Sequence, residues 1–132
     1  MTGDITRRLA KIESTDLAFH NGSILTAYLH VNYGGGLAQG IGGYSLDRYD
    51  RATQRRIGTA YGCEFIRRIL LACGVERWED LPGRTIYVIQ TEEQTRLGAA
   101  GALGIAPLAT EPGEEFLFDD LSVMAESELA KV

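Results

Sequence analysis

The chain has 132 residues, of which 45% are apolar and 23% are charged. This length and composition are typical of one globular domain with a real core, and they exclude a disordered or fibrous chain. The net charge of −5 argues against general nucleic-acid binding, because affinity for phosphates depends on clustered Lys and Arg.

The N-terminal third predicts an antiparallel meander of three strands. The first strand is expected around Ile12–Phe19, with Ile5–Lys11 as a segment that could extend it, and Asn21-Gly22 is a strong hairpin signal. Apolar and polar residues alternate over Ile24–Tyr33, which predicts a half-buried second strand. The glycines that follow would turn the chain again, so that Leu37–Leu46 returns as a third strand with a bulge or strong twist.

A long helix is predicted next. Asp47 and Asp50 are both suitable caps for a helix that begins near Arg51. Apolar residues then recur at steps of three and four as far as Cys73, and Gly74 is a typical stop signal. The pattern therefore places one amphipathic helix directly after the third strand.

Two glycines interrupt the helical pattern. Gly58 and Gly62 each cost about 1 kcal/mol relative to Ala in a helix interior. We therefore expect the sheet to cross the helix closely at these positions, with a break near Gly58 as the alternative.

The C-terminal half predicts further strands and a last helix. Arg84–Thr91 alternates as a fourth strand, and Leu97–Leu108 is either a fifth strand or an ordered loop. After Pro112-Gly113, apolar residues at helical spacing predict an acidic C-terminal helix within residues 111–132. The expected fold is α+β in a single domain over residues 1–132, with residues 1–10 left open as a flexible segment. A homodimer would cover the open edge of such a small sheet.

The richest local signal is the glycine-rich segment 33–44, in which six of twelve residues are Gly. We favour its interpretation as a turn and a bulged strand, because it matches neither the dinucleotide-binding nor the P-loop spacing. The alternative is a nest of backbone N–H groups that binds a nucleotide-like anion beside nearby arginines. The residues of that candidate site are Gly35, Gly36, Gly40, Gly42, Gly43, Arg48, Arg51 and Arg55.

Catalytic and metal-binding patterns receive little support from the sequence. Cys63 and Cys73 lie ten residues apart on the predicted helix, where apolar neighbours favour core packing. His20 falls in a turn and His30 on the polar face of a strand, and no spacing matches a zinc site. We therefore expect no catalytic residues, metal or cofactor, and keep a small enzyme built on Cys63 or His30 as an alternative.

Charge is distributed unevenly along the chain. Residues 48–68 hold six arginines and two acidic residues, a net charge of +4, whereas residues from Glu111 onward have a net charge of −6. We expect the two regions to neutralise each other, either within one fold or across a homo-oligomer. The acidic residues that could instead bind a partner are Glu114, Glu115, Asp119 and Asp120.

The sequence also predicts a cytoplasmic location. The cysteines are expected to be reduced, and the N-terminus lacks the basic and apolar regions of a secretory signal. No stretch is long and apolar enough to cross a bilayer, so no membrane partner is expected.

Several ordered motifs together resemble a small protein family found in bacteriophages and prophages. The resemblance spans Lys11 to Val88 and does not extend into the C-terminal third. Its residues are Lys11-Ile12-Glu13-Ser14-Thr15, Tyr33-Gly34-Gly35, Gln39-Gly40 with Gly42-Gly43-Tyr44 and Leu46-Asp47, Phe65-Ile66-Arg67-Arg68-Ile69-Leu70, and Trp78-Glu79-Asp80-Leu81-Pro82-Gly83.

This resemblance implies an accessory phage protein in the cytoplasm of a bacterial host. Small acidic phage proteins of this kind often bind and block a host factor, including CRISPR effectors and other defence components. The expected function is therefore a non-catalytic inhibitor of a host defence protein, which docks through its acidic tail or its exposed strand face. The alternatives are a binder of a nucleotide-like anion and the small enzyme named above.

Overall fold

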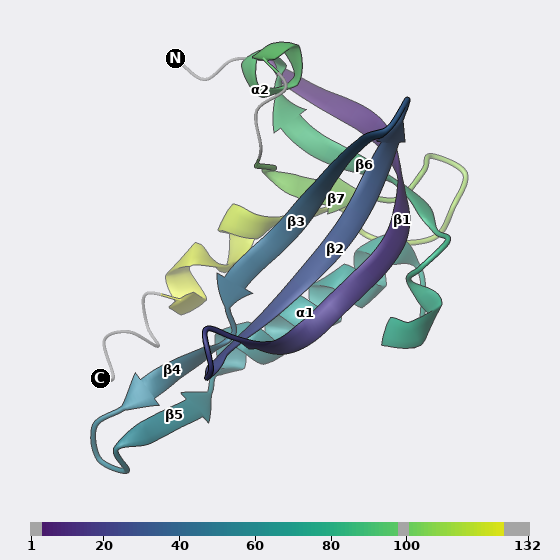
Figure 1. Cartoon of the computed structure of the whole chain (residues 1–132). Coiled ribbons are helices and arrows are strands. Elements are labelled where there is room, and N and C mark those ends of the chain that lie inside the picture. Colours follow the sequence, from purple (N-terminus) through teal and green to yellow (C-terminus); the bar gives the residue numbers. More distant parts are fainter. Residues whose placement is uncertain (1–3, 98–100, 126–132) are drawn as a thin grey trace.

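The computed structural model describes residues 4–97 and 101–125 (Figure 1). It is an α+β fold, as predicted, with an antiparallel sheet in the order β3-β2-β1-β6-β7-β8 and a separate hairpin of β4 and β5. The strands are β1 (Ile5–His20), β2 (Ile24–Gly34), β3 (Leu37–Ser45), β4 (Asp47–Asp50), β5 (Arg55–Gly58), β6 (Thr85–Thr91), β7 (Gly104–Ala106) and β8 (Phe116–Leu117). The helices are α1 (Ala60–Cys73) and α2 (Glu92–Leu97), with 3₁₀ turns η1 (Trp78–Asp80) and η2 (Phe118–Leu121).

β1 joins the two halves of the sheet. Its residues 5–11 pair with β6, and residues 11–20 pair with β2. The register shifts by one residue between Ile12 and Ser14, which marks a β-bulge. Because side chains alternate along a strand, the bulge exchanges the two faces, so that Leu17 shares the core face with Ile12.

The predicted meander of β1, β2 and β3 is confirmed. Gly34 to Gly36 form the turn between β2 and β3, and β3 pairs with β2 along its length. Two register shifts in this pairing confirm the predicted bulge, one next to the turn and one near Gly42 and Gly43. The glycine-rich segment is thus a hairpin turn followed by an irregular edge strand.

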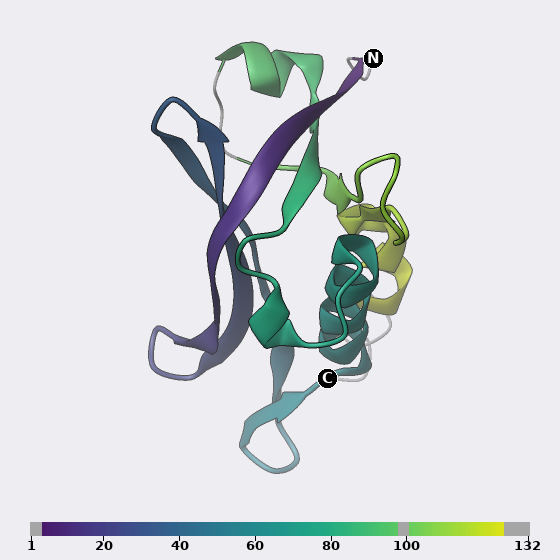
Figure 2. The same ribbon diagram turned by 90° about the vertical axis from the view of Figure 1, so that its right-hand side faces the viewer.

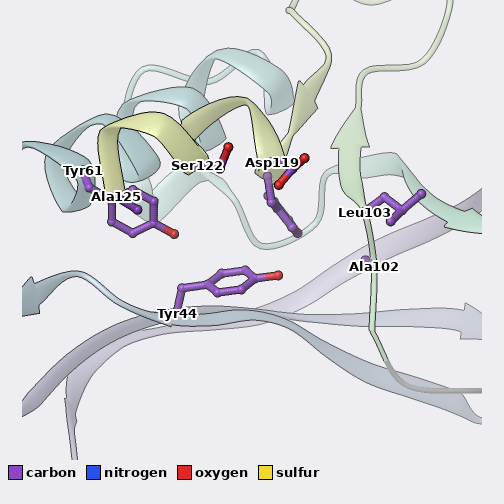
Figure 3. Close-up of a pocket in the computed structure, with 8 residues that line it drawn as sticks. Tyr44, Tyr61, Ala102, Leu103, Asp119, Ser122 and Ala125 are labelled. Atoms are coloured by element: carbon purple, nitrogen blue, oxygen red, sulfur yellow. The ribbon is translucent and has the colours of Figure 1, made fainter. Parts of the chain in front are cut away.

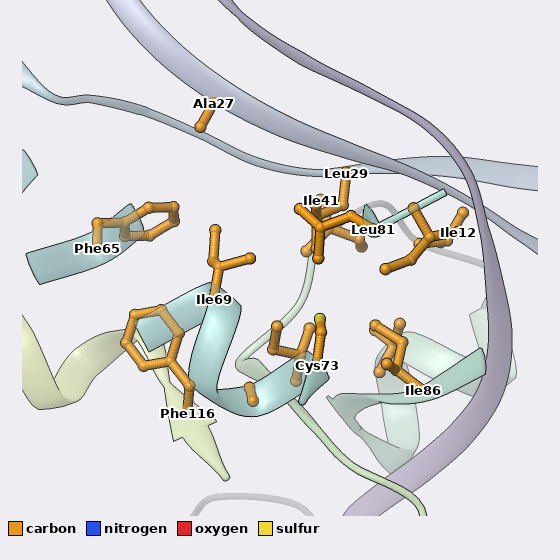
Figure 4. Close-up of a cluster of buried hydrophobic side chains, with 14 of the residues drawn as sticks. Ile12, Ala27, Leu29, Ile41, Phe65, Ile69, Cys73, Leu81, Ile86 and Phe116 are labelled. Atoms are coloured by element: carbon orange, nitrogen blue, oxygen red, sulfur yellow. The ribbon is translucent and has the colours of Figure 1, made fainter. Parts of the chain in front are cut away.

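The core lies between the sheet and α1 (Figures 2 and 4). Residues with less than 2% exposure include Leu29 of β2, Phe65 of α1 and Ile86 of β6. Phe65 packs edge-on against Phe116 of β8, with ring centroids 5.5 Å apart. One helix therefore packs against strands from both ends of the chain.

The segment 47–58 corrects the predicted start of the helix. It forms the β4–β5 hairpin, and α1 begins only at Ala60 with Thr59 as its N-cap. Asp50 caps the hairpin turn instead, because its carboxylate accepts hydrogen bonds from the backbone N–H and the hydroxyl of Thr53. Asp47 pairs with Arg56 on the opposite strand at 2.8 Å. The alternative of a helix broken near Gly58 is also wrong, because the residues before Gly58 form strands and the helix starts after it.

The helix ends where the sequence predicts. Gly74 adopts the left-handed conformation, and the N–H groups of Gly74 and Val75 bond to the carbonyls of Leu71 and Leu70. This arrangement satisfies carbonyl groups that the last turn would leave free.

The close approach predicted at Gly62 is confirmed, since α1 contacts the backbone of Leu46 at this position. A Cβ atom at this position would lie 2.1 Å from the carbonyl oxygen of Leu46, which no side chain allows. Thr59 strengthens the same contact, since its hydroxyl donates to the Leu46 carbonyl at 2.8 Å and accepts from the Gly62 N–H at 2.9 Å. Gly58 differs, because open space surrounds its position.

The C-terminal half also departs from the predicted boundaries. Helix α2 was not predicted, and only the end of Leu97–Leu108 forms the fifth strand, β7. Residues 111–115 are not helical, and β8 and η2 precede the helical residues 122–125. The predicted acidic helix therefore begins later than expected, and residues 126–132 of it lie outside the described residues.

We expect Gly62→Ala to lower the free energy of unfolding by about 1–3 kcal/mol, as overpacking does, because its methyl group meets the Leu46 backbone. Urea denaturation measures the change. Gly58→Ala is the matched control, and should leave the stability unchanged or raise it by up to about 1 kcal/mol. Equal stability of the two variants would show that the helix does not approach Leu46 closely.

Candidate functional site

The candidate anion site is divided between two ends of the molecule. Gly35 and Gly36 form the turn at one end of β3, whereas Arg48, Arg51 and Arg55 belong to the β4–β5 hairpin beyond its other end (Figure 1). β3 has nine residues, so it separates the two groups by about 30 Å at 3.3 Å per residue. The structure therefore does not bring the predicted glycines and arginines into one cradle.

The other candidate glycines allow close packing within the fold. A Cβ atom at Gly42 would lie 2.6 Å from the carbonyl oxygen of Ala27, whereas Gly40 and Gly43 make room for an aromatic ring. A Cβ atom at Gly43 would lie 2.5 Å from the ring of Tyr28, and one at Gly40 would lie 3.4 Å from it. Tyr28 also stacks on His30 and meets the edge of His20. The glycines thus let a tyrosine ring lie flat on the outer face of the sheet.

Most basic residues of the predicted positive region have acidic partners nearby. Arg48 lies 3.6 Å from Asp50, and Arg67 lies 3.4 Å from Glu64. Arg51 is at the tip of the β4–β5 hairpin and is exposed. Asp50 and Glu64 are already counted in the net charge of +4, and the pairs of Arg56 with Asp47 and of Arg68 with Asp120 offset two further positive charges.

Two of the four acidic candidates form ion pairs within the described residues, and the other two do not. Glu115 pairs with Arg7 of β1, and Asp120 pairs with Arg68 of α1 at 3.3 Å. The second pair joins the positive and negative regions within one chain. Glu114 and Asp119 are exposed and have no ion pair among the described residues.

The candidate catalytic residues lie on opposite sides of the sheet. His30 is on the outer face, where its ring nitrogen lies 2.7 Å from the carboxylate of Asp16. Cys63 is exposed on α1, which packs against the inner face. Cys73 is buried in the core, and burial raises the pKa of its thiol to about 12. The structure therefore forms no Cys–His pair from these residues.

An apolar surface lies where the β1–β2 and β4–β5 hairpins meet. Phe19 is 68% exposed, Leu17 is 43% exposed and Tyr49 is 47% exposed. A groove of about 260 Å³ links Phe19 to Asp47 and Arg56 at the base of β4–β5. Tyr49 is paired with Arg56 in the hairpin register and so points to the same side.

We call Leu17, Phe19, Tyr49 and Arg56 the hairpin-end surface. The sequence alone places Leu17 and Phe19 on one face of a strand. The sequence does not show that this face of the strand extends beyond the part of the sheet that α1 covers.

A second concave site lies between β3, α1 and η2 (Figure 3). Its volume is about 390 Å³, which is within the range of small-molecule pockets. We call it the aromatic cavity, and its lining residues are Tyr44, Tyr61, Ala102, Leu103, Phe118, Asp119, Ser122 and Ala125. Of these, only Asp119 was singled out from the sequence, because the others come from segments that only the fold brings together.

Comparisons with known proteins do not assign the chain to a family. No family model matches the sequence, and no curated protein or solved structure is significantly similar to it. Within residues 4–97 and 101–125, no three His, Cys, Asp or Glu side chains gather as metal ligands. In the same part of the chain, no helix has the length and apolar character needed to cross a membrane.

The Asp47–Arg56 pair makes stability depend on pH. Burial raises the pKa of Asp47, but hydrogen bonds from Arg56, Leu25 N–H and Ser45 outweigh it and hold the pKa below its ordinary value. A lowered folded-state pKa stabilises the protein above the unfolded pKa of about 4, and this contribution is lost as the pH falls through the folded value.

We expect Asp47→Asn to cost about 1–3 kcal/mol at pH 7 because it removes hydrogen bonds to a charged group. The difference from the parent protein should shrink as the pH falls below about 4, because the unfolded chain takes up a proton at Asp47 first and the folded protein follows at its lower pKa. Urea denaturation at neutral and acidic pH measures both values. A difference that does not change with pH would contradict this account of Asp47.

The two cysteines should differ in reactivity toward a disulfide reagent at pH 8. Cys63 is exposed and should react in the folded protein. Cys73, with a pKa of about 12, has a thiolate fraction of about one in ten thousand and should react only on unfolding. Absorbance should report one rapid thiol per chain, and none in Cys63→Ser. Two rapid thiols would show that Cys73 is accessible.

Proposed function

We propose that the chain is a non-catalytic binding protein that docks on a bacterial host protein and inhibits it, with a defence factor as the target. The hairpin-end surface is the docking site in this proposal. The observation that carries it is the exposure of Leu17 and Phe19 on the face of the sheet that elsewhere forms the core.

Geometry explains why this face is left uncovered. Leu17 pairs with the buried Ala27, and Phe19 pairs with Leu25, which packs against the core. Strand β1 has 16 residues and spans about 53 Å, whereas α1 has 14 residues and spans about 21 Å. One helix cannot cover the whole strand, so apolar side chains continue beyond it.

The composition of this surface suits a protein partner. Aromatic residues and Arg are enriched at the centres of protein interfaces, and exposed apolar patches often mark them. Phe19 and Tyr49 supply aromatic rings, and Arg56 lies between the two hairpins.

Placement of the candidate nucleophile supports a non-catalytic role. Cys63 and His30 are separated by the sheet, and Cys73 is a buried thiol with a raised pKa. The phage context comes from the resemblance of residues 11–88, and a small binding protein that blocks a defence factor is what that resemblance implies.

We expect expression of the chain to restore phage plaques on bacteria that carry a susceptible defence system, and Phe19→Asp to abolish the rescue. The reason is that a charge replaces the most exposed aromatic ring of the docking surface. The measurement is plaque efficiency on a panel of strains that each carry one system. Affinity capture of the matching defence component then tests for a stoichiometric complex.

Leu37→Asp is the matched control, because Leu37 is 47% exposed and begins β3 at the opposite end of the sheet. It should keep both rescue and capture. Circular dichroism spectra of both variants check that they are folded. Rescue that survives Phe19→Asp would contradict the docking site, and no rescue on any strain would contradict inhibition of those defence systems.

A further inference from the structure

The aromatic cavity combines ring faces with one carboxylate. Tyr44 meets Phe118 at an interplanar angle of 66°, with ring centroids 5.6 Å apart. Tyr61 forms another wall from the start of α1. Figure 3 shows Tyr44 across the cavity from Asp119 and Ser122.

Asp119 is the lining residue that carries a formal charge. Its neighbour Asp120 is paired with Arg68, but Asp119 has no ion pair or hydrogen bond from its side chain among the described residues. The hydroxyls of Tyr44, Tyr61 and Ser122 add polar groups to the lining. Burial, and secondarily Tyr44, raise the pKa of Tyr61, which keeps that hydroxyl protonated.

We propose that this cavity binds a small organic cation, whose ammonium group contacts the rings and the Asp119 carboxylate. Aromatic faces carry negative partial charge and attract ammonium groups, and alkylated ammonium ions suit aromatic cages best. The carboxylate adds a Coulombic attraction that an anion would oppose. The site is separate from the hairpin-end surface, so it does not depend on the proposed inhibitory function.

The same features disfavour a nucleotide-like anion at this position. No Lys or Arg lines the cavity in the described structure, and its wall carries a carboxylate instead. Its volume of about 390 Å³ leaves room for a cation larger than the ammonium group itself. The ligand class is therefore an amine or quaternary ammonium compound with an apolar or hydroxylated body.

A titration with choline tests the proposal directly. Its neutral isostere, 3,3-dimethyl-1-butanol, has the same shape without the charge and so separates cation binding from apolar filling. Amide and tyrosine ring signals in nuclear magnetic resonance spectra report binding at the cavity. We expect saturable shifts at Asp119, Ser122 and Tyr44 with choline, and at least about tenfold weaker binding of the isostere, a difference of about 1.4 kcal/mol.

Neighbouring acidic residues provide a matched pair of variants. Asp119→Asn should weaken choline binding about tenfold or more, whereas Asp120→Asn should change it less than about twofold, because Asp120 lies on Arg68. Tyr44→Leu keeps apolar bulk but removes the ring, and should also weaken binding. Amide spectra show whether each variant is folded.

Three results would overturn the proposal: no saturable shift with choline, equal binding of the isostere, or unchanged affinity in folded Asp119→Asn. A peptide with Nε-trimethyl-lysine distinguishes the sources of the cation. Tighter binding of the peptide than of choline assigns the cavity to a side chain of a partner protein. Equal or weaker binding assigns it to a free small molecule.

Discussion

The contact between Gly62 and the Leu46 carbonyl determines how the helix lies on the sheet. Without a Cβ atom, α1 can approach the chain that leaves β3, and Thr59 fixes the approach with two hydrogen bonds. Tyr61 precedes Gly62, and Tyr44 lies two residues before Leu46. The same contact therefore brings together two walls of the aromatic cavity, so the packing that holds the fold also shapes the site.

Charge pairing divides the surface into regions with different roles. The Arg68–Asp120 and Arg7–Glu115 pairs hold the C-terminal segment against α1 and β1. Exposed pairs of this kind contribute at most about 1 kcal/mol each, so they orient the segment more than they stabilise it. Once such pairs are accounted for, Asp119 has no ion pair with any of the residues that the structure describes, and it lines the aromatic cavity.

Local signals predicted the meander and the end of the helix, because a strand alternation, an Asn-Gly turn or a C-terminal Gly depends on neighbouring residues alone. The predicted role of Asp47 as a helix cap was wrong. Its carboxylate suits a cap as well as the cross-strand pair with Arg56, and only the tertiary structure selects the pair. Helix α2 had a readable signal that was missed. Thr91 and Gln94 form a reciprocal capping box. The aromatic cavity had none, since Tyr44, Tyr61 and Asp119 come from three distant segments.

The double pairing of β1 has a consequence for the order of folding. Its second half can join β2 across a short hairpin as soon as both have been synthesised, but its first half must wait for β6, about 80 residues later. Contacts between such distant residues slow folding because a long loop must close first. On the ribosome, the first half of β1 therefore lacks its strand partner while the intervening chain is translated. Ala10 and Ile12, which are buried in the finished fold, would then be available to chaperones, or to aggregation, during that interval.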